Sequence, residues 1–372
     1  MIYADYAATT PVSERVCAVL SNATREVFGN PSSLHSVGRN AARLVNRARE
    51  QVAALLGCLP EEVFFTSGGT ESDNHAVRLA AGRNIVTSEI EHPAVLEAAR
   101  HMSGRLDLID TEPSGRASVS SLAHLLGERE VALVSLMYAN NETGVVQPVR
   151  EAAAAAHAVG ALFHCDAVQG VGHVMPSVRE LDCDLMSVSG HKLHAPKGIG
   201  VIYIRKDIVE NVPALHYGGG QERGIRSGTL PVPLIAALGE ACDEARERMH
   251  EDDRRITRLR DAIEDELLTI RDSVRLGSGE RMPGILDIAF SGAGGEALTL
   301  LCDLRGVAIS AGSACHSGDL SPSRVLLSMD VPSELALSAI RISIGRYTTS
   351  EEAERIASTV RTCLALSLGS VG

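Results

Sequence analysis

Lys192 is one of only three lysines in the 372-residue chain, whereas 32 of the 35 basic residues are arginines. It follows an apolar run at 185–188 and closes the sequence Ser-Gly-His-Lys at 189–192. A lysine amine can lose its proton when it is desolvated and then form an imine with a carbonyl, which an arginine guanidinium cannot do. The placement indicates a reactive lysine. The alternative is an ordinary loop lysine in a chain that uses lysine rarely.

A carboxylate and a glycine-rich turn extend this chemistry. Asp166 stands at the end of another apolar segment, 26 residues before Lys192. An imine-forming lysine with a carboxylate for a pyridinium nitrogen is the minimal set of groups for a pyridoxal-phosphate enzyme. In the turn at 66–72, Gly69 and Thr70 stand between a strand-like run and a helical one, where exposed N–H groups favour a phosphate. Such a turn is also a common helix cap, so alone it is weak.

Three further polar side chains follow strand-like runs and could contact the ring of such a cofactor. His92 precedes a proline, and its imidazole could stack on the ring and move protons. Asn141 and Gln169 could each donate to the ring oxygen. Taken singly, a histidine before a proline is more often a helix-start residue, and Asn141 is compatible with ordinary turn chemistry.

Two motifs in the second half of the chain suggest a nucleophile and a carboxylate-binding group. Cys315 stands among small residues at 310–320, which favours an accessible thiol whose thiolate is the nucleophilic form. Arg341 lies inside an apolar strand-like run, where its guanidinium needs a partner. A substrate carboxylate could pair with it in bidentate fashion, and an internal salt bridge is the alternative. The glycine-rich segment 218–229, with two arginines and Thr229, favours an anion-binding loop.

Composition excludes several classes of protein. Hydrophobic residues make up 45% of the chain, yet no run approaches the roughly 18 apolar residues of a membrane helix. A net charge of −12 disfavours direct nucleic-acid binding. The eight cysteines form no CxxC pair, so we expect neither disulfides nor a metal site. The N-terminus shows no export signal, and we therefore expect a cytoplasmic location with no membrane partner.

Apolar runs alternate with helical stretches over the first 240 residues or so, which predicts an α/β fold with a largely parallel sheet. From about 233 to 274 the apolar spacing becomes helical, which predicts one long amphipathic helix or a pair that leads into a smaller α+β part. Another helical segment is expected at about 350–366. The expected strands are 63–66, 84–87, 131–136, 161–164, 185–188 and 200–204.

Together these segments resemble the NifS/IscS-like cysteine desulfurases, which are class V enzymes of the aspartate-aminotransferase fold. The resemblance implies a large domain at 14–249 with a mainly parallel seven-stranded sheet. It also implies a smaller α+β domain, made of 1–13 and 250–372, that carries the cysteine loop. The motifs that carry the resemblance span nearly the whole chain, in the expected order: 4–11, 29–33, 66–74, 189–192, 223–229 and 312–315.

The resemblance assigns roles to these residues. Lys192 would bind pyridoxal 5′-phosphate covalently and move a proton, Asp166 would keep the pyridine nitrogen protonated, and His92 would stack on the ring. Arg341 would hold the substrate carboxylate, and Cys315 would take the substrate sulfur as a persulfide. The phosphate would be held by Gly69, Thr70, Ser189 and His191 and by Thr229 of a neighbouring subunit, which implies a homodimer, while Asn30 and Asn141 would contact the substrate.

The implied activity is conversion of L-cysteine to L-alanine, with sulfur passed from Cys315 to an acceptor protein. The sequence ends soon after its last helical segment, without the C-terminal extension of housekeeping members. General iron–sulfur cluster assembly and a dedicated role, such as nitrogenase-type clusters or DNA phosphorothioation, are therefore both open. His316 replaces the small hydroxyl residue expected after the cysteine. A selenocysteine lyase or aminotransferase of the same fold and a non-catalytic scaffold subunit are the alternatives.

Overall fold

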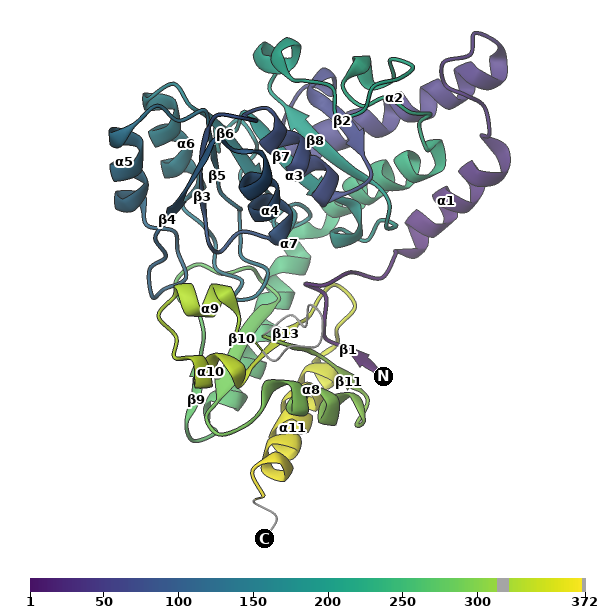
Figure 1. Cartoon of the computed structure of the whole chain (residues 1–372). Helices are drawn as coiled ribbons and strands as arrows, with labels where there is room; N and C mark the ends of the chain where they lie inside the picture. Colours follow the sequence, from purple (N-terminus) through teal and green to yellow (C-terminus); the bar gives the residue numbers. More distant parts are fainter. Residues whose placement is uncertain (313–320, 370–372) are drawn as a thin grey trace.

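The computed structural model describes residues 1–312 and 321–369. A sheet flanked by helices forms the larger part of the molecule, and a smaller part lies beneath it in Figure 1. The helix α7 (Val232–Leu268) runs from one part into the other. Both chain ends lie in the smaller part, so the first residues pack beside segments that come last in the sequence.

The large sheet has the strand order β2-β8-β7-β6-β5-β3-β4. All neighbouring pairs are parallel except those of β8, which runs antiparallel to both β2 and β7. Its residues are buried throughout, as expected of a strand with helices on both faces. A mainly parallel seven-stranded sheet is therefore confirmed. The strands are β2 (Val63–Thr66), β3 (Asn84–Ser88), β4 (Arg105–Ile109), β5 (Leu133–Ser135), β6 (Leu162–Asp166), β7 (Leu185–Ser189) and β8 (Gly200–Ile204).

Amphipathic helices surround this sheet. In α6 (Val149–Ala158) the buried residues are Val149, Ala152, Ala153 and Ala156, the spacing of one helical face. Short 3-10 turns, η1 (Pro60–Glu62), η2 (Gly190–Lys192), η3 (Lys206–Asn211) and η4 (Glu222–Gly224), lie between the longer elements. The other helices are α1 (Glu14–Glu26), α2 (Ser36–Leu56), α3 (Gly69–Arg78), α4 (Pro93–Met102) and α5 (Val119–Glu128).

The smaller part contains a four-stranded antiparallel sheet in the order β12-β13-β10-β9, with a separate parallel pair of β1 and β11. Thr349 and Glu352 form a reciprocal cap at the start of α11, which fixes where that helix begins. The strands are β1 (Ile2–Tyr3), β9 (Ser273–Arg275), β10 (Ile285–Phe290), β11 (Val307–Ala308), β12 (Ser310–Ala311) and β13 (Ala339–Ser343). The helices are α8 (Gly295–Asp303), α9 (Arg324–Ser328), α10 (Ser333–Leu337) and α11 (Ser350–Ser367).

The helix α7 contributes to two separate cores. Leu238 and Cys242 in its first half belong to the core beneath the large sheet. Ile256, Ile263 and Leu267 in its second half belong to the core of the smaller part, which also contains Ile2 and Ala4 from the beginning of the chain. One continuous helix therefore occupies most of the region for which the sequence allowed either one helix or two. No helix within the described ranges has the length and apolarity needed to cross a membrane.

Candidate active site

A cavity of about 270 Å³ opens where β6 and β7 end. Ligands of open α/β sheets bind beyond the carboxyl ends of the strands, so this is the expected place for a site. Ten of the residues selected from the sequence line it: Gly69, Thr70, His92, Asn141, Asp166, Gln169, Ser189, His191, Lys192 and Arg341. The fold brings together residues that are up to 272 positions apart in the chain, from Gly69 to Arg341.

Lys192 ends the short turn η2, directly after β7. Its Nζ donates to the backbone carbonyls of Ala7 and Ala8, the second at 3.0 Å. Burial, reinforced by the positive charge of Arg341, lowers the pKa of Lys192 to about 8. A substantial fraction of this amine is therefore unprotonated near neutral pH, which is the form that attacks a carbonyl.

Asp166 is the last residue of β6, and its side chain is buried. Its Oδ1 accepts from the backbone N–H of Val168 at 2.9 Å. Burial raises the pKa of Asp166, and the hydrogen bond from Val168 together with the nearby His92 and Lys192 opposes that rise. A positively charged pyridinium would add a further partner that favours the carboxylate.

A second buried carboxyl, Asp73 of α3, also lines the cavity. Burial and the neighbouring Asp166 raise the pKa of Asp73 well above its usual value. Its Oδ1 is buried and has no hydrogen-bond partner among the described residues. Neighbouring carboxyls favour opposite protonation states, and the strong rise in the pKa of Asp73 holds that carboxyl towards its neutral form.

The start of α3 forms the anion-binding end of the cavity. The first N–H groups of a helix have no partner inside the helix, and Gly69 and Thr70 begin this one. A Cβ atom at Gly69 would lie 2.8 Å from Val168 and 3.5 Å from Ser189, so glycine lets these segments pack closely. Burial lowers the pKa of His191 to about 4, which makes its imidazole neutral at physiological pH.

His92 is the residue that precedes α4, and its Nδ1 accepts from the backbone N–H of Ala94 at 3.1 Å. An Nδ1 that accepts carries no proton, so the neutral imidazole holds its proton on Nε2. The helix cap thus fixes the tautomer of a histidine that lines the cavity. The two interpretations of His92 from the sequence, helix start and site residue, both apply.

Arg341 lies in β13 and reaches the cavity from the smaller part. Its Nη1 donates to the backbone carbonyl of Asn141 at 2.9 Å. Its Nη2 donates to Asp5 at 2.8 Å and to Ser310 at 3.3 Å. The internal salt bridge, which the sequence offered as the alternative to a substrate carboxylate, is therefore present, and Arg341 also lines the cavity.

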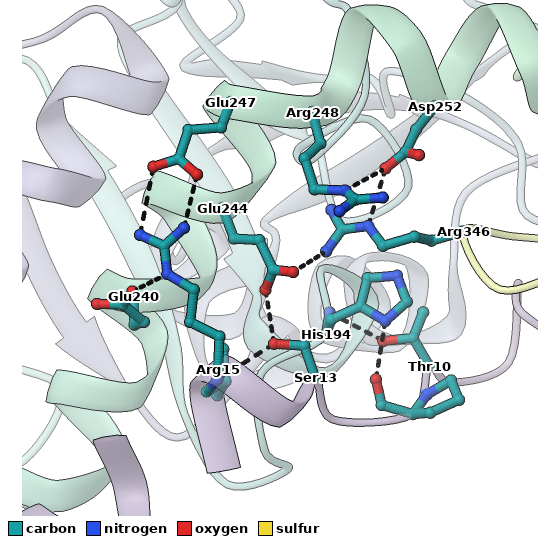
Figure 2. A network of polar contacts seen from close by, with 12 residues as sticks. Thr10, Ser13, Arg15, His194, Glu240, Glu244, Glu247, Arg248, Asp252 and Arg346 are labelled. Atoms are coloured by element: carbon teal, nitrogen blue, oxygen red, sulfur yellow. Dashed lines mark hydrogen bonds and ion pairs between the residues drawn. The ribbon is translucent and has the colours of Figure 1, made fainter. Parts of the chain in front are cut away.

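Behind Lys192, the residue His194 fixes the lysine loop to the N-terminal segment. Its backbone N–H donates to Thr10 Oγ1 at 2.9 Å, and its Nδ1 lies 2.8 Å from the carbonyl of Pro11. Burial, with the nearby Arg346, lowers the pKa of His194 to about 4, so the ring is neutral and Nδ1 donates to that carbonyl. Figure 2 shows His194 and Thr10 facing each other beside the larger charge network.

That charge network joins α7 to the segments on either side of it (Figure 2). The buried guanidinium of Arg346 pairs with Glu244 at 3.0 Å and with Asp252 at 2.9 Å, both on α7. Glu244 also accepts from the hydroxyl of Ser13, which caps α1. The N-terminal segment, the lysine loop and the residues after β13 are therefore held to one helix.

Two of the selected residues lie elsewhere. Asn30 and Thr229 are exposed and do not line the cavity of this single chain. Cys315 and its neighbour His316 lie outside the described residues. The two arginines of the glycine-rich loop have internal partners: Arg226 pairs with Glu71 of α3 at 2.8 Å, and Arg223 stacks on Phe64.

Sequence reasoning missed two features of the site. Asp73 lies within a helix among other polar residues, and only its position relative to Asp166 reveals its role. The N-terminal segment was selected as part of a motif, but no residue of it was assigned to the site. In the structure Ala7 and Ala8 supply the carbonyls that hold Lys192, and Asp5 pairs with Arg341.

The cavity suits pyridoxal phosphate on the chemistry of its groups alone. It offers helix N–H groups and hydroxyls for a phosphate, an amine with a lowered pKa for an aldehyde, and a carboxylate for a ring nitrogen. Comparison with known families agrees: residues 2–356 match the model of the aminotransferase class-V family. The chain belongs to this family. It is an enzyme whose cofactor is pyridoxal 5′-phosphate.

Individual relatives show which members of that family the chain resembles. The chain is 43% identical over 367 residues to a protein named cysteine desulfurase from Gluconacetobacter diazotrophicus, covering 95% of this chain and 91% of the relative. A solved structure titled NifS-like protein superposes with a TM-score of 0.90 at 34% identity, covering 98% of this chain and 99% of the other. The structure of SspA in complex with cysteine superposes with a TM-score of 0.80 at 29% identity, covering 94% and 100%.

Proposed function

We propose that this chain is an L-cysteine desulfurase, which releases L-alanine and passes the sulfur through a Cys315 persulfide to an acceptor protein. One observation carries the proposal: a single cavity contains a depressed-pKa lysine, a buried aspartate and a strand arginine, in a chain 43% identical to a named cysteine desulfurase. The relative titled SspA in complex with cysteine supports the choice of substrate.

The cofactor would occupy this cavity. When bound, it supplies an electron sink that stabilises negative charge on the substrate carbon next to the amino group. Gly69, Thr70, Ser189 and His191 would hold its phosphate, and Asp166 would pair with its ring nitrogen. Asn141 and Gln169 would contact the ring oxygen.

Lys192 and His92 would handle the protons. Lys192 would hold the cofactor through its unprotonated amine, and the same amine would take up the proton of the substrate carbon. His92, which holds its proton on Nε2, would stack on the ring and exchange that proton with the substrate. Arg341 would orient the substrate through its carboxylate.

Cys315 would accept the sulfur. Its thiolate attacks the substrate sulfur, so that a sulfur–sulfur bond forms while the bond between sulfur and the substrate's terminal carbon breaks. The electron pair of the broken bond stays with that carbon, which is then protonated to give L-alanine. The outer sulfur atom of the persulfide then passes to an acceptor protein in iron–sulfur cluster assembly or in a dedicated sulfur modification.

The test is release of sulfide and alanine from L-cysteine in the presence of a thiol reductant. The wild-type protein releases the two in equimolar amounts, and Cys315→Ala releases neither. A matched control is Cys17→Ala, since Cys17 is also a free thiol and is exposed. Activity that survives in Cys315→Ala contradicts the persulfide step and favours a lyase. Inactivity of the wild type with every amino acid favours a scaffold subunit.

We also propose a homodimer in which Thr229 completes the phosphate site of the partner subunit and Asn30 contributes to substrate binding. Exposed apolar side chains near these two residues support an interface, since Phe28, Leu34 and Tyr217 are 79%, 89% and 85% exposed. Mixed dimers of Lys192→Ala and Thr229→Ala subunits would contain one intact site. They should therefore recover activity that neither variant shows alone, up to half of the wild-type value per dimer. No recovery in dimers shown to be mixed would exclude a shared site.

The domain division at residue 249 is a further proposal, with 14–249 as one domain and 1–13 with 250–372 as the other. Because α7 is continuous from Val232 to Leu268, this boundary would separate two packing units rather than two independent stretches of chain. The separate cores on its two halves support the division. A cytoplasmic location is proposed because free cysteines persist in a reducing compartment.

A further inference from the structure

The carboxylate that pairs with Arg341 comes from the chain's own N-terminal segment. Asp5 Oδ1 lies 2.8 Å from Nη2, and the two side chains are only 21% and 11% exposed. The partial burial matters because water screens a charge pair less when both members are removed from it. Asp5 thus contacts the guanidinium in the way that the carboxylate of a bound ligand would.

The geometry of the guanidinium makes this contact restrictive. A carboxylate pairs with arginine in bidentate fashion either through Nε and Nη2 or through Nη1 and Nη2, so both arrangements need Nη2. Here Nη2 already donates to Asp5 and to Ser310, whereas Nε is buried without a partner among the described residues. An incoming carboxylate must therefore displace one of these two acceptors, and it approaches the charge of Asp5 in either case.

Asp5 is also the carboxylate best placed to oppose a second negative charge. Glu142 and Asp287 lie near Arg341, but both are buried, and burial raises the pKa of each. They are thus held towards the neutral form. Asp5, which forms the ion pair, supplies the negative charge at this guanidinium.

We propose that Asp5 sets the affinity of the carboxylate subsite by competing with the substrate carboxylate for Arg341. The inference rests on the proposed role of Arg341 in holding that carboxylate. Its consequence for the reaction is that the product, L-alanine, is held less tightly and leaves more readily. Asp5 acts here as a specificity-determining residue, because it tunes how strongly the site favours amines that carry a carboxylate.

The test compares two ligands that differ only in the carboxylate, L-alanine and ethylamine, by titrating the cofactor absorbance of the holoenzyme. Asp5→Asn keeps the shape and an acceptor oxygen but removes the charge. It should tighten L-alanine binding by at least about tenfold, because the ligand carboxylate no longer competes with a charged acceptor for Nη2. Ethylamine binding should stay unchanged. Asp303→Asn, which removes an exposed charge at the end of α8, is the matched control and should alter neither ligand.

The outcomes separate this inference from the function on which it rests. If the wild type binds L-alanine no better than ethylamine, Arg341 does not hold a carboxylate and the proposed function loses its support there. If the wild type discriminates but Asp5→Asn binds L-alanine equally or more weakly, competition by Asp5 is wrong. Asp5→Ser is a second variant that removes the charge, with the same expected direction, and Asp5→Glu, which keeps the charge, should not tighten binding.

Discussion

The two ends of the cavity solve the problem of buried charge in different ways. At the proposed cofactor end, Asp166 is buried near Asp73, and the two carboxyls would repel each other if both were charged. The strongly raised pKa of Asp73 reduces this repulsion. At the proposed substrate end, Arg341 forms an ion pair with Asp5 from a distant segment. Protonation of a carboxyl lowers the buried charge at the first end, whereas an ion pair balances the buried charge at the second. A permanent cofactor and a passing substrate require these different solutions.

The largest effect is expected from the residue between the two ends. Lys192→Ala should lower the rate of alanine formation by at least about a thousandfold, because both attachment of the cofactor and proton transfer depend on one amine. The visible absorbance of covalently bound cofactor should disappear as well. Lys206→Ala is the control, since Lys206 is an exposed lysine paired with Glu61. Retained absorbance in Lys192→Ala would assign the attachment to another group.

A smaller loss is expected when the charge at the cofactor end is removed. Asp166→Asn keeps the acceptor for Val168 but cannot stabilise a protonated ring nitrogen. It should lower kcat by about 10²-fold or more, the scale found when a preorganised charge partner is removed from a site. Steady-state kinetics with L-cysteine measures this. A wild-type kcat would show that Asp166 is not the partner of the ring nitrogen.

The pH dependence of cofactor attachment tests the state of Lys192. The folded-state pKa is lowered to about 8 from an ordinary value of 10.5, so the amine is protonated below pH 8 and reactive above it. The rate at which cofactor-free protein takes up pyridoxal phosphate should therefore rise through a midpoint near pH 8. A midpoint close to 10.5 would contradict the effect of burial and of Arg341.

The smallest effect should come from the neutral carboxyl. Because burial and Asp166 raise the pKa of Asp73 well above its usual value, Asp73→Asn replaces a neutral acid with a neutral amide of similar shape. The change in unfolding free energy should stay within about 1 kcal/mol, as for swaps that conserve volume, and kcat should stay within a few-fold of wild type. Thermal unfolding and kinetics measure both. A loss as large as that of Asp166→Asn would mean that Asp73 carries the charge.

Much of the large sheet could be predicted from the sequence because most of its strands lie in apolar runs, whereas the edge strand β4, which contains Arg105 and Asp107, was not predicted. The predicted strands 63–66 and 200–204 coincide with β2 and β8, and the helix expected at about 350–366 is Ser350–Ser367. The short strands β11 and β12 have two residues each and were not predicted. Pairing partners that are distant in the chain, rather than any local pattern, define such strands.

The site also contains residues that the local sequence reveals and others that only the fold reveals. Lys192 and Asp166 were found because Asp166 ends an apolar strand and Lys192 closes the turn that follows one, a signal present in the local sequence. The pairing of Asp5 with Arg341 joins residues 336 positions apart, and no local pattern indicates it. The same holds for Asp73, whose raised pKa depends on Asp166, a residue of another element. Local patterns revealed the reactive groups, and the fold revealed what tunes them.

The most direct test of the division between the two ends is the split between kcat and KM for L-cysteine in two variants. Arg341→Ala should raise KM by roughly 10- to 100-fold, as expected for loss of a charge-assisted carboxylate contact, and change kcat much less. Asp166→Asn should lower kcat and change KM much less. If both variants change the same parameter to the same extent, the two ends do not act on separate parts of the reaction, and the account is wrong.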